Sequence, residues 1–195
     1  TRFDGKVLTI ELPPAPATYV AYFEPFSWDR HLALLADCVA RGARQRRLGS
    51  SLQGRDLDEL MIGQGARPVW IIARQHPGET MAEWFVEGLM QRLLDPADAV
   101  ARELRQMATF HIVPNMNPDG SVLGNLRTNA AGANLNREWL EPTTERSPEV
   151  KVVRDAIHAS GCAAFFDIHG DENLPYVFVA GCEMLPGFSD RKAAE

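Results

Sequence analysis

The chain has 195 residues, 45% of them hydrophobic and 24% charged, a composition typical of a globular protein with a substantial core. Its formal net charge of -6 and pI near 5.4 argue against broad electrostatic binding to nucleic acid or to an anionic membrane. No apolar stretch approaches the ~20 residues that span a bilayer, and no charged-then-apolar leader opens the chain. Cys38, Cys162 and Cys182 are too widely spaced to suggest a disulfide framework or a thiolate metal site. We therefore expect a cytoplasmic protein without nucleic-acid or membrane partners.

The first part of the chain mixes strand-like and helical patterns. Residues 7–12 alternate like a strand and are stopped by the stiff, proline-rich residues 13–16, after which residues 19–23 predict a second strand. Ser27 is placed to cap a helix that ends at Gly42. A basic run follows, which we interpret as the solvated end of that helix: Arg41, Arg44, Arg46 and Arg47.

The central part of the chain leads from strands into a helix. Residues 47–56 and 57–62 predict two strands joined at a turn. The apolar residues 68–73 predict a buried parallel strand, and apolar residues recur at helical spacing over 80–94. His76 and Glu79 therefore fall in the turn between the carboxyl end of a strand and a helix, where open α/β sheets place their ligand crevices.

The second half of the chain continues the alternation. We expect a helix over 97–107, a strand over 109–113, a helix over 147–160 opened by Ser147, and a strand over 162–168. Residues 115–136 predict a long loop, and loops of this length are usually functional or disordered. Strands that alternate with helices indicate an α/β sheet with helices on both faces.

Three residues match the donor set of a catalytic zinc site, which needs three protein ligands and one open position. His76, Glu79 and His169 each lie just beyond a predicted strand, so the sheet brings them within reach of one another. A His-x-x-Glu pair alone is weak evidence, since a loop histidine and a first-turn acid explain it equally well. The other histidines, inside predicted elements, are interpreted as structural: His31, His111 and His158.

Four ordered motifs strengthen the zinc interpretation. Together they resemble the zinc metallocarboxypeptidases of the M14 type, with most similarity to the cytosolic carboxypeptidase branch, over about residues 20 to 180. The motifs are His76-Pro77-Gly78-Glu79, Pro114-Asn115-Met116-Asn117-Pro118-Asp119-Gly120, Asn134-Leu135-Asn136-Arg137-Glu138-Trp139 and Asp167-Ile168-His169-Gly170-Asp171-Glu172.

The resemblance implies a fold and a set of roles. It implies a three-layer α/β/α fold with a mixed, largely parallel central sheet, and one zinc ion per chain bound by the His-Glu-His set. It also implies that Asn136 and Arg137 hold the terminal carboxylate of a peptide substrate, and that Arg127 faces the scissile carbonyl. These roles suit the residues, because a guanidinium binds carboxylate through two parallel donors and stabilises a developing oxyanion.

Two features depart from the family pattern. Asn134 stands where the family commonly has an aspartate that supports the first zinc histidine, although an amide oxygen still accepts a hydrogen bond from His76. The family's general-base glutamate lies on a strand far downstream of His169, and we therefore expect it beyond residue 195. Glu172 and Glu138 are nearby carboxylates, but neither has the expected position.

The resemblance also predicts the domain organisation. Residues 1–23 are expected to be the end of a preceding β-rich domain, and residues 24–195 the N-terminal part of the catalytic domain. Lys192-Ala193-Ala194-Glu195 shows no evident domain end, so we expect the chain to be part of a longer protein.

Three functions remain open at this point. The leading hypothesis is a zinc carboxypeptidase that hydrolyses the C-terminal peptide bond of peptides or protein tails, with acidic, glutamate-rich tails implied by the cytosolic branch. An aspartoacylase-type N-acyl amino acid amidohydrolase shares the ligand arrangement. A catalytically silent domain that keeps the metal and binds peptide termini is the third. The sequence gives no indication of the oligomeric state.

Overall fold

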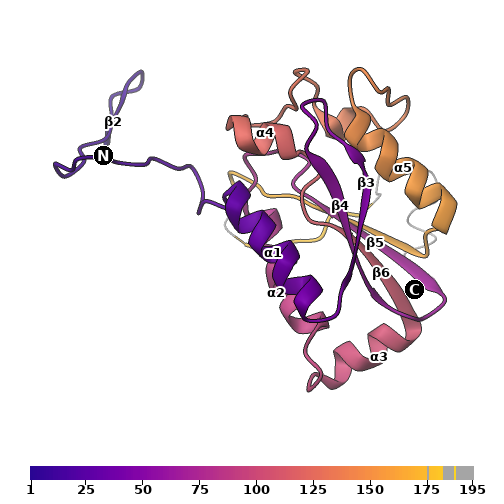
Figure 1. The fold of residues 1–195 in the computed structure, drawn as a ribbon. Helices are drawn as coiled ribbons and strands as arrows, with labels where there is room; N and C mark the ends of the chain where they lie inside the picture. Colours follow the sequence, from indigo (N-terminus) through magenta and orange to yellow (C-terminus); the bar gives the residue numbers. More distant parts are fainter. Residues whose placement is uncertain (175, 182–186, 188–195) are drawn as a thin grey trace.

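The computed structural model describes residues 1–174, 176–181 and 187, and Cys182 and the segment from Lys192 to Glu195 lie outside these residues. Its main body is a five-stranded mixed sheet between two layers of helices (Figure 1). The elements in chain order are β1 (Arg2–Phe3), β2 (Leu8–Thr9), α1 (Trp28–Ala40), β3 (Arg44–Ser50), β4 (Asp56–Gly63), β5 (Arg67–Ala73), α2 (Met81–Leu93), α3 (Ala99–Met107), β6 (Ala108–Val113), α4 (Pro118–Leu123), the 3-10 turn η1 (Leu135–Arg137), α5 (Pro148–Ser160) and β7 (Ala164–Ile168).

The sheet has the strand order β3-β4-β6-β5-β7. β3 pairs with β4, and β4 with β6, in the antiparallel sense, whereas β5 pairs in parallel with both β6 and β7. The three parallel strands end at the same edge, because Ile72 lies opposite both Val113 and Asp167. This shared edge brings the segments that follow β5, β6 and β7 together, as expected for a sheet of this type.

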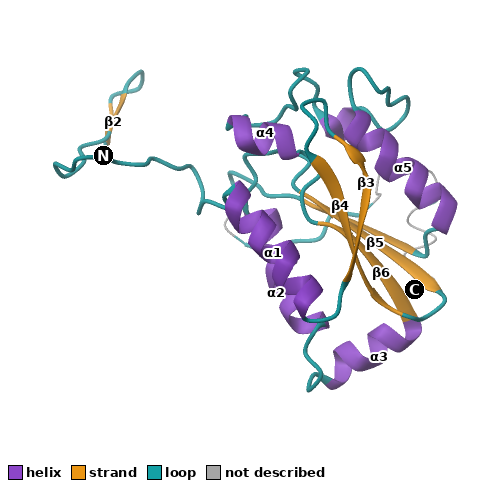
Figure 2. Cartoon of the chain, in the orientation of Figure 1, coloured by secondary structure: helices purple, strands orange, loops and turns teal. Residues whose placement is uncertain are grey.

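Each face of the sheet has its own hydrophobic core, which confirms the predicted three-layer arrangement. Along β5, Ile71 and Ala73 pack into one core with the buried residues of α1 and α2. Trp70 and Ile72 point the other way and pack with α5. Figure 2 shows α1 and α2 on one side of the sheet and α5 on the other. Alternation with period two along a strand covered on both faces explains why residues 68–73 are apolar throughout.

The opening segment differs from the prediction. Residues 19–23 form no strand, and residues 7–12 contribute only the short strand β2, which pairs with β1. Tyr19 is 97% exposed, and this segment runs away from the main body in Figure 1. A β-rich composition forms a strand only where a neighbouring strand supplies backbone partners, and the described residues supply none to 19–23. The assignment of 1–23 to a preceding β-rich domain stays a prediction.

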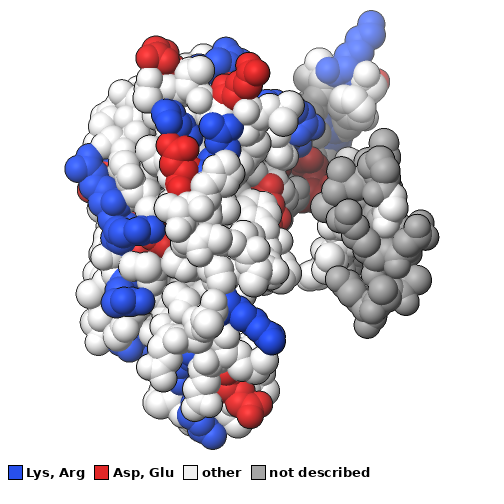
Figure 3. Space-filling view, turned by 90° about the vertical axis from the view of Figure 1, so that its right-hand side faces the viewer, with Lys and Arg blue, Asp and Glu red and all other residues white. Residues whose placement is uncertain are grey.

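The interpretation of the arginine run as a helix end holds for Arg41, the C-cap residue of α1, and is wrong for the other three arginines. α1 ends at Ala40, and Arg44, Arg46 and Arg47 lie on the edge strand β3. Arg46 pairs with Glu59 at 2.6 Å and Arg47 with Asp56 at 2.7 Å, so acids on β4 neutralise two of these cations. On the face shown in Figure 3, basic and acidic side chains are interspersed. The ion pairs between β3 and β4 stabilise these arginines on a strand, although their clustering after a helix is also typical of a helix end.

Two local predictions near the ends of helices also change. The loop predicted over 115–136 contains α4, whose first turn has Asn117 as its cap and Pro118 at the first position. Ser147 stands at the predicted start of α5 but makes no capping hydrogen bond there. By contrast, Ser27 caps α1 by accepting a hydrogen bond from the N–H of Arg30, as predicted.

In the part of the chain that the structure describes, no helix is long and apolar enough to cross a membrane.

Candidate metal and substrate site

The site begins at the turn between β5 and α2. Arg74 adopts a left-handed backbone conformation with φ 57°, which turns the chain sharply after the strand. Its buried guanidinium donates to the carbonyl of Pro77 at 2.9 Å and forms an ion pair with Glu83 of α2. Gly78 N–H donates to the carbonyl of Leu126 at 2.9 Å. The His76-to-Glu79 loop is thus held from both sides.

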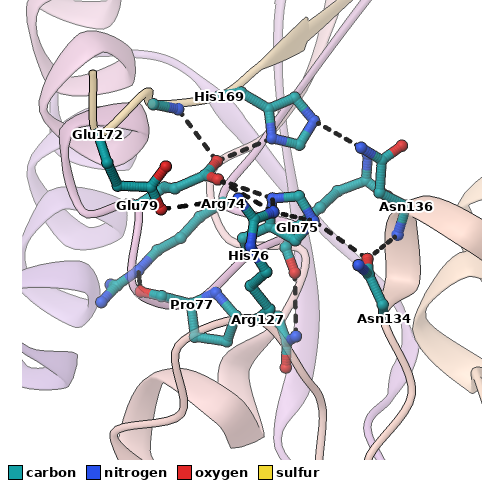
Figure 4. A network of polar contacts seen from close by, with 12 residues as sticks. Arg74, Gln75, His76, Pro77, Glu79, Arg127, Asn134, Asn136, His169 and Glu172 are labelled. Carbon is teal, nitrogen blue, oxygen red and sulfur yellow. Dashed lines mark hydrogen bonds and ion pairs between the residues drawn. The ribbon is translucent and has the colours of Figure 1, made fainter. Parts of the chain in front are cut away.

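Three side chains from two strand ends meet at this loop (Figure 4). His76 Nδ1 lies 2.8 Å from one carboxylate oxygen of Glu79, and His169 Nδ1 lies 2.8 Å from the other. Possible ligand atoms of the three residues all lie within 4.8 Å of one another. The structure therefore brings together the three residues that the sequence proposes as ligands, although His169 follows β7 and the other two follow β5.

The remaining ring nitrogens face outward to other partners. His76 Nε2 lies 3.0 Å from Asn134 Oδ1, and His169 Nε2 lies 2.9 Å from Asp167 Oδ2. Such outer hydrogen bonds fix which nitrogen carries the proton and leave the inner nitrogen as a metal ligand. Asn134 thus makes the contact expected of the family's aspartate at this position.

Electrostatics hold the ligand set together. Burial alone would raise the pKa of Glu79, but hydrogen bonds from His169, His76 and the Gly170 N–H lower this pKa to about 2. Burial would lower the pKa of His169, but hydrogen bonds to Asp167 and Glu79 raise it to about 9. The carboxylate is therefore ionised at neutral pH, as metal binding requires.

The donor set suits zinc. Two imidazole Nδ1 atoms and one carboxylate point at the same place, and each imidazole is oriented by an outer partner. His76 and Glu79 are buried, whereas the His169 side chain is 27% exposed, so the site opens to solvent on that side. A zinc ion there would be held by the two Nδ1 atoms and the Glu79 carboxylate, which have to be free of protons to bind it.

The proposed substrate residues surround this donor set. Arg127 Nη1 lies 3.1 Å from His76 Nδ1, and the side chain is 44% exposed (Figure 4). Asn136 Nδ2 lies 3.4 Å from His169 Nε2. Arg137 is exposed, and its contact is with the carbonyl of its neighbour Asn136 at 3.2 Å. Arg127 and Asn136 thus reach the donor set directly, and Arg137 lies beside them on η1.

The two nearby carboxylates have other contacts. Glu138 pairs with Arg146 at 3.0 Å, away from the donor set. Glu172 lies 3.6 Å from Arg127 Nη2. Its charge faces the guanidinium.

Two groups at the site have no assigned role in the sequence motifs. Asp167 lies two residues before His169, so both point to the same side of the chain, and this spacing could have indicated the contact. The N–H of Gly170 donates to Glu79 Oε2 at 3.0 Å. A backbone donor has no signature in the sequence.

His31 and His111 make buried contacts away from the donor set, as predicted, whereas the structural role of His158 stays a prediction. His31 Nδ1 lies 2.7 Å from Glu83 in the interior between α1 and α2. His111 Nδ1 lies 2.5 Å from Glu59, and its ring stacks on Trp70 at 4.7 Å between centroids.

The family model of zinc carboxypeptidases matches residues 31–181 of this chain. An uncharacterized protein of Zymomonas mobilis is 54% identical over 188 residues, which cover 95% of this chain and 50% of that protein. Cytosolic carboxypeptidase 4 of Mus musculus is 38% identical over 124 residues, which cover 60% of this chain and 11% of that protein.

The chain is also similar to solved structures of metallo-carboxypeptidases. A metallo-carboxypeptidase from Burkholderia cenocepacia has 60% sequence identity and a TM-score of 0.84, with 89% of this chain and 48% of that chain covered. A metallo-carboxypeptidase from Pseudomonas aeruginosa, solved in complex with (2-guanidinoethylmercapto)succinic acid, has 49% identity and a TM-score of 0.83, with 89% and 47% covered. The chain thus spans about half the length of these bacterial relatives.

Proposed function

The chain belongs to the zinc carboxypeptidase family, and from this we propose that its protein is a metallocarboxypeptidase that hydrolyses the C-terminal peptide bond of peptides or protein tails. The observation that carries the proposal is the convergence of His76 Nδ1, His169 Nδ1 and the Glu79 carboxylate beside Arg127. This site has the metal ligands, the guanidinium of Arg127 and an opening to solvent in one place.

Different residues are proposed to bind the substrate and to stabilise the transition state. Arg137 and Asn136 are proposed to bind the terminal carboxylate, since Arg137 has no acidic partner among the described residues and is exposed. Arg127 is proposed to donate to the carbonyl oxygen as its charge grows. Zinc, when bound, polarises the scissile carbonyl and lowers the pKa of a water molecule. His76, Glu79 and His169 would hold one zinc ion per chain.

The identity of the preferred C-terminal residue is a separate proposal. We propose acidic, glutamate-rich tails because the motif resemblance implies them, and a cytoplasmic location because a relative is named a cytosolic carboxypeptidase. The P. aeruginosa relative, however, was solved with a ligand that carries a guanidino group as well as a succinic acid group. A guanidino group would suit an acidic pocket rather than a basic one, so both side-chain classes have to be tested.

The test uses three peptides that differ only at the C-terminus, which is glutamate, arginine, or glutamate with an amidated carboxyl group. N-acetyl aspartate is assayed as a fourth substrate. We expect the zinc-loaded protein from the full reading frame to release the last residue of the first peptide. It should leave the amidated peptide intact, because Asn136 and Arg137, the carboxylate clamp, have no terminal carboxylate to bind. Preference for arginine would overturn the acidic specificity only. Cleavage of N-acetyl aspartate without peptide cleavage would favour the amidohydrolase, and binding without any turnover would favour the silent binding domain.

A further inference from the structure

Gln75 lies at the point where three of the sequence motifs meet, although it ligates nothing. It is fully buried between Arg74 and His76. Its side-chain Nε2 donates to Asp167 Oδ2 at 2.6 Å, and its Oε1 accepts from Trp139 Nε1 at 2.8 Å. Its backbone carbonyl accepts from Asn117 Nδ2 at 3.0 Å. The side-chain nitrogen, the side-chain oxygen and the backbone carbonyl of this one residue thus bind three different segments.

The chemistry of its partners fixes the orientation of this amide. An indole N–H only donates, and an ionised carboxylate only accepts. The Gln75 oxygen must therefore face Trp139, and its nitrogen must face Asp167. If the amide were flipped, its nitrogen would face the Trp139 N–H, another donor, and its oxygen would face the Asp167 carboxylate, another acceptor.

The contact with Asp167 continues to a metal ligand. Asp167 Oδ2 also lies 2.9 Å from His169 Nε2. Its other oxygen, Oδ1, is buried and has no hydrogen-bond partner in the described part of the chain. The position of this carboxylate therefore depends on Gln75 on one side and on His169 on the other.

The contact with Trp139 leads to the substrate residues. Trp139 follows Asn136 and Arg137 by a few positions, and its ring packs at the edge of the α5 core, 6.0 Å from the ring of Phe165. The indole N–H is thus a fixed donor on the segment that carries the carboxylate clamp. A continuous set of hydrogen bonds joins Trp139, Gln75, Asp167 and His169.

We propose that Gln75 is a positioning residue that orients His169 through Asp167 and fixes its spacing from the clamp through Trp139. The part of this inference that concerns Asn136 and Arg137, the carboxylate clamp, rests on the proposed function. The part that concerns the orientation of His169 does not depend on any substrate. Loss of the Gln75 amide would free the Asp167 carboxylate to rotate, and the imidazole would lose its fixed orientation toward Glu79. Loss of a direct partner of a ligand, as Asp167 is of His169, typically weakens metal binding about 10- to 100-fold. Gln75 acts through Asp167, so its loss should have a smaller effect.

The first experiment replaces the amide in the protein from the full reading frame. Gln75→Met keeps the length of the side chain and removes both hydrogen bonds. We expect the zinc Kd, measured by competition with a chromophoric chelator, to rise, but by less than the about 10- to 100-fold that loss of a direct partner of a ligand causes. In the metal-free protein, the proton NMR signal of the His169 Nε2–H should broaden or vanish, because its bond to Asp167 is no longer held.

A reciprocal exchange separates positioning from mere stability. Gln75→Glu places a carboxylate against Asp167, so it should weaken zinc binding. Gln75 Nε2 and His169 Nε2 both contact Asp167 Oδ2. The double variant Gln75→Glu with Asp167→Asn pairs the two side chains again, but the amide N–H that faces position 75 also faces the Nε2–H donor of His169. We expect the double variant to regain stability in urea unfolding without regaining the wild-type zinc Kd.

Trp139→Phe has a matched control in Trp70→Phe. Both changes remove an indole N–H donor from the same core, in which Trp70 is fully and Trp139 partly buried, but Trp70 donates to Ser160 Oγ at 3.0 Å, away from the site. We expect Trp139→Phe to raise KM for peptides more than Trp70→Phe does, at equal loss of stability.

The outcomes are distinguishable. If Gln75→Met keeps the wild-type zinc Kd and the wild-type His169 signal while it lowers stability, the positioning role is wrong. If the wild-type protein binds zinc but turns over no peptide, the proposed function fails, whereas the Kd and NMR readouts still decide the role of Gln75.

Discussion

His169 joins the metal ligands at the largest distance along the chain, so its removal is the sharpest test of the donor set. We expect His169→Ala to abolish zinc retention, because only His76 and Glu79 would remain of the three ligands. Metal analysis of the purified variant measures this. His158→Ala, on the exposed end of α5, is the control and should retain zinc. Stoichiometric zinc in the His169 variant would refute the assignment.

Arg127 tests the chemistry of the transition state. The side chain lies over His76 and is partly exposed, so it is free to contact a substrate carbonyl. We expect Arg127→Ala to lower kcat about 100-fold, equivalent to ~3 kcal/mol of barrier, with a small change in KM, because the contact strengthens as charge develops. Steady-state kinetics with a glutamate-ended peptide measure both. In Arg137→Ala the main effect should be on KM, and the reverse pattern would exchange the two roles.

At the scale of elements, α4 supports the loop that carries His76. A Cβ atom on Gly120 would lie 2.4 Å from Pro77 Cγ and 2.6 Å from the carbonyl oxygen of Thr128. We expect Gly120→Ala to destabilise the protein by ~1–3 kcal/mol and to weaken zinc binding, because the Pro77 ring and the Thr128 backbone have to move. Urea unfolding and the zinc Kd measure these effects.

Gly88 provides the matched control for that substitution. It lies in α2, and an added Cβ would meet nothing within 4 Å. Gly88→Ala should stabilise the protein by up to ~1 kcal/mol through helix propensity, with no effect on zinc binding. If Gly120→Ala and Gly88→Ala changed the free energy of unfolding and the zinc Kd equally, α4 would not support the loop.

The first turn of α5 contains a buried acid with a shifted pKa. Burial raises the pKa of Glu149 to about 7 from 4.5, and the nearby Asp119 acts in the same direction, against a hydrogen bond from Asn129. The folded protein therefore holds this proton up to higher pH than the unfolded chain does. The stability that the proton provides is complete below about pH 4.5 and is lost as the pH rises toward 7.

The matching substitution isolates this contribution. Glu149→Gln cannot ionise, so its free energy of unfolding relative to wild type should rise by up to ~3 kcal/mol between pH 4.5 and 8. Urea unfolding at several pH values measures the difference. A hydrogen bond from Thr144 lowers the pKa of Glu145, on the exposed loop before α5, so Glu145→Gln should follow the wild-type pH dependence from about pH 5.5 to 8 and differ only at lower pH. A constant difference between Glu149→Gln and wild type at all pH values would contradict the prediction.

At the scale of the whole molecule, the donor set and the rest of the catalytic machinery are separable. The described residues contain all three proposed ligands, whereas the chain spans about half the length of its bacterial relatives. We propose that the general base lies outside residues 1–195, as the family resemblance implies. We expect residues 1–195 alone to bind zinc, and the protein from the full reading frame to add peptide turnover. Turnover by residues 1–195 alone would direct attention to Glu172 or Glu138 as the base.

The sequence predicted the elements that local patterns control. The apolar run of β5, the spacing in α2 and the Ser27 cap each depend on near neighbours, and all three were confirmed. The four motifs also indicated which residues meet, since the ends of parallel strands share one edge of the sheet. The amino-acid sequence by itself therefore determined the fold class and the candidate ligands.

Only the tertiary structure decided what depends on partners far away in the chain. Acids on β4 determine the environment of Arg46 and Arg47, and the lack of a paired neighbour among the described residues leaves 19–23 without a strand. The orientation of each ligand imidazole follows from Asn134 and Asp167. The joining role of Gln75 has no local signature, because its three hydrogen-bond partners come from three separate segments that folding alone brings together.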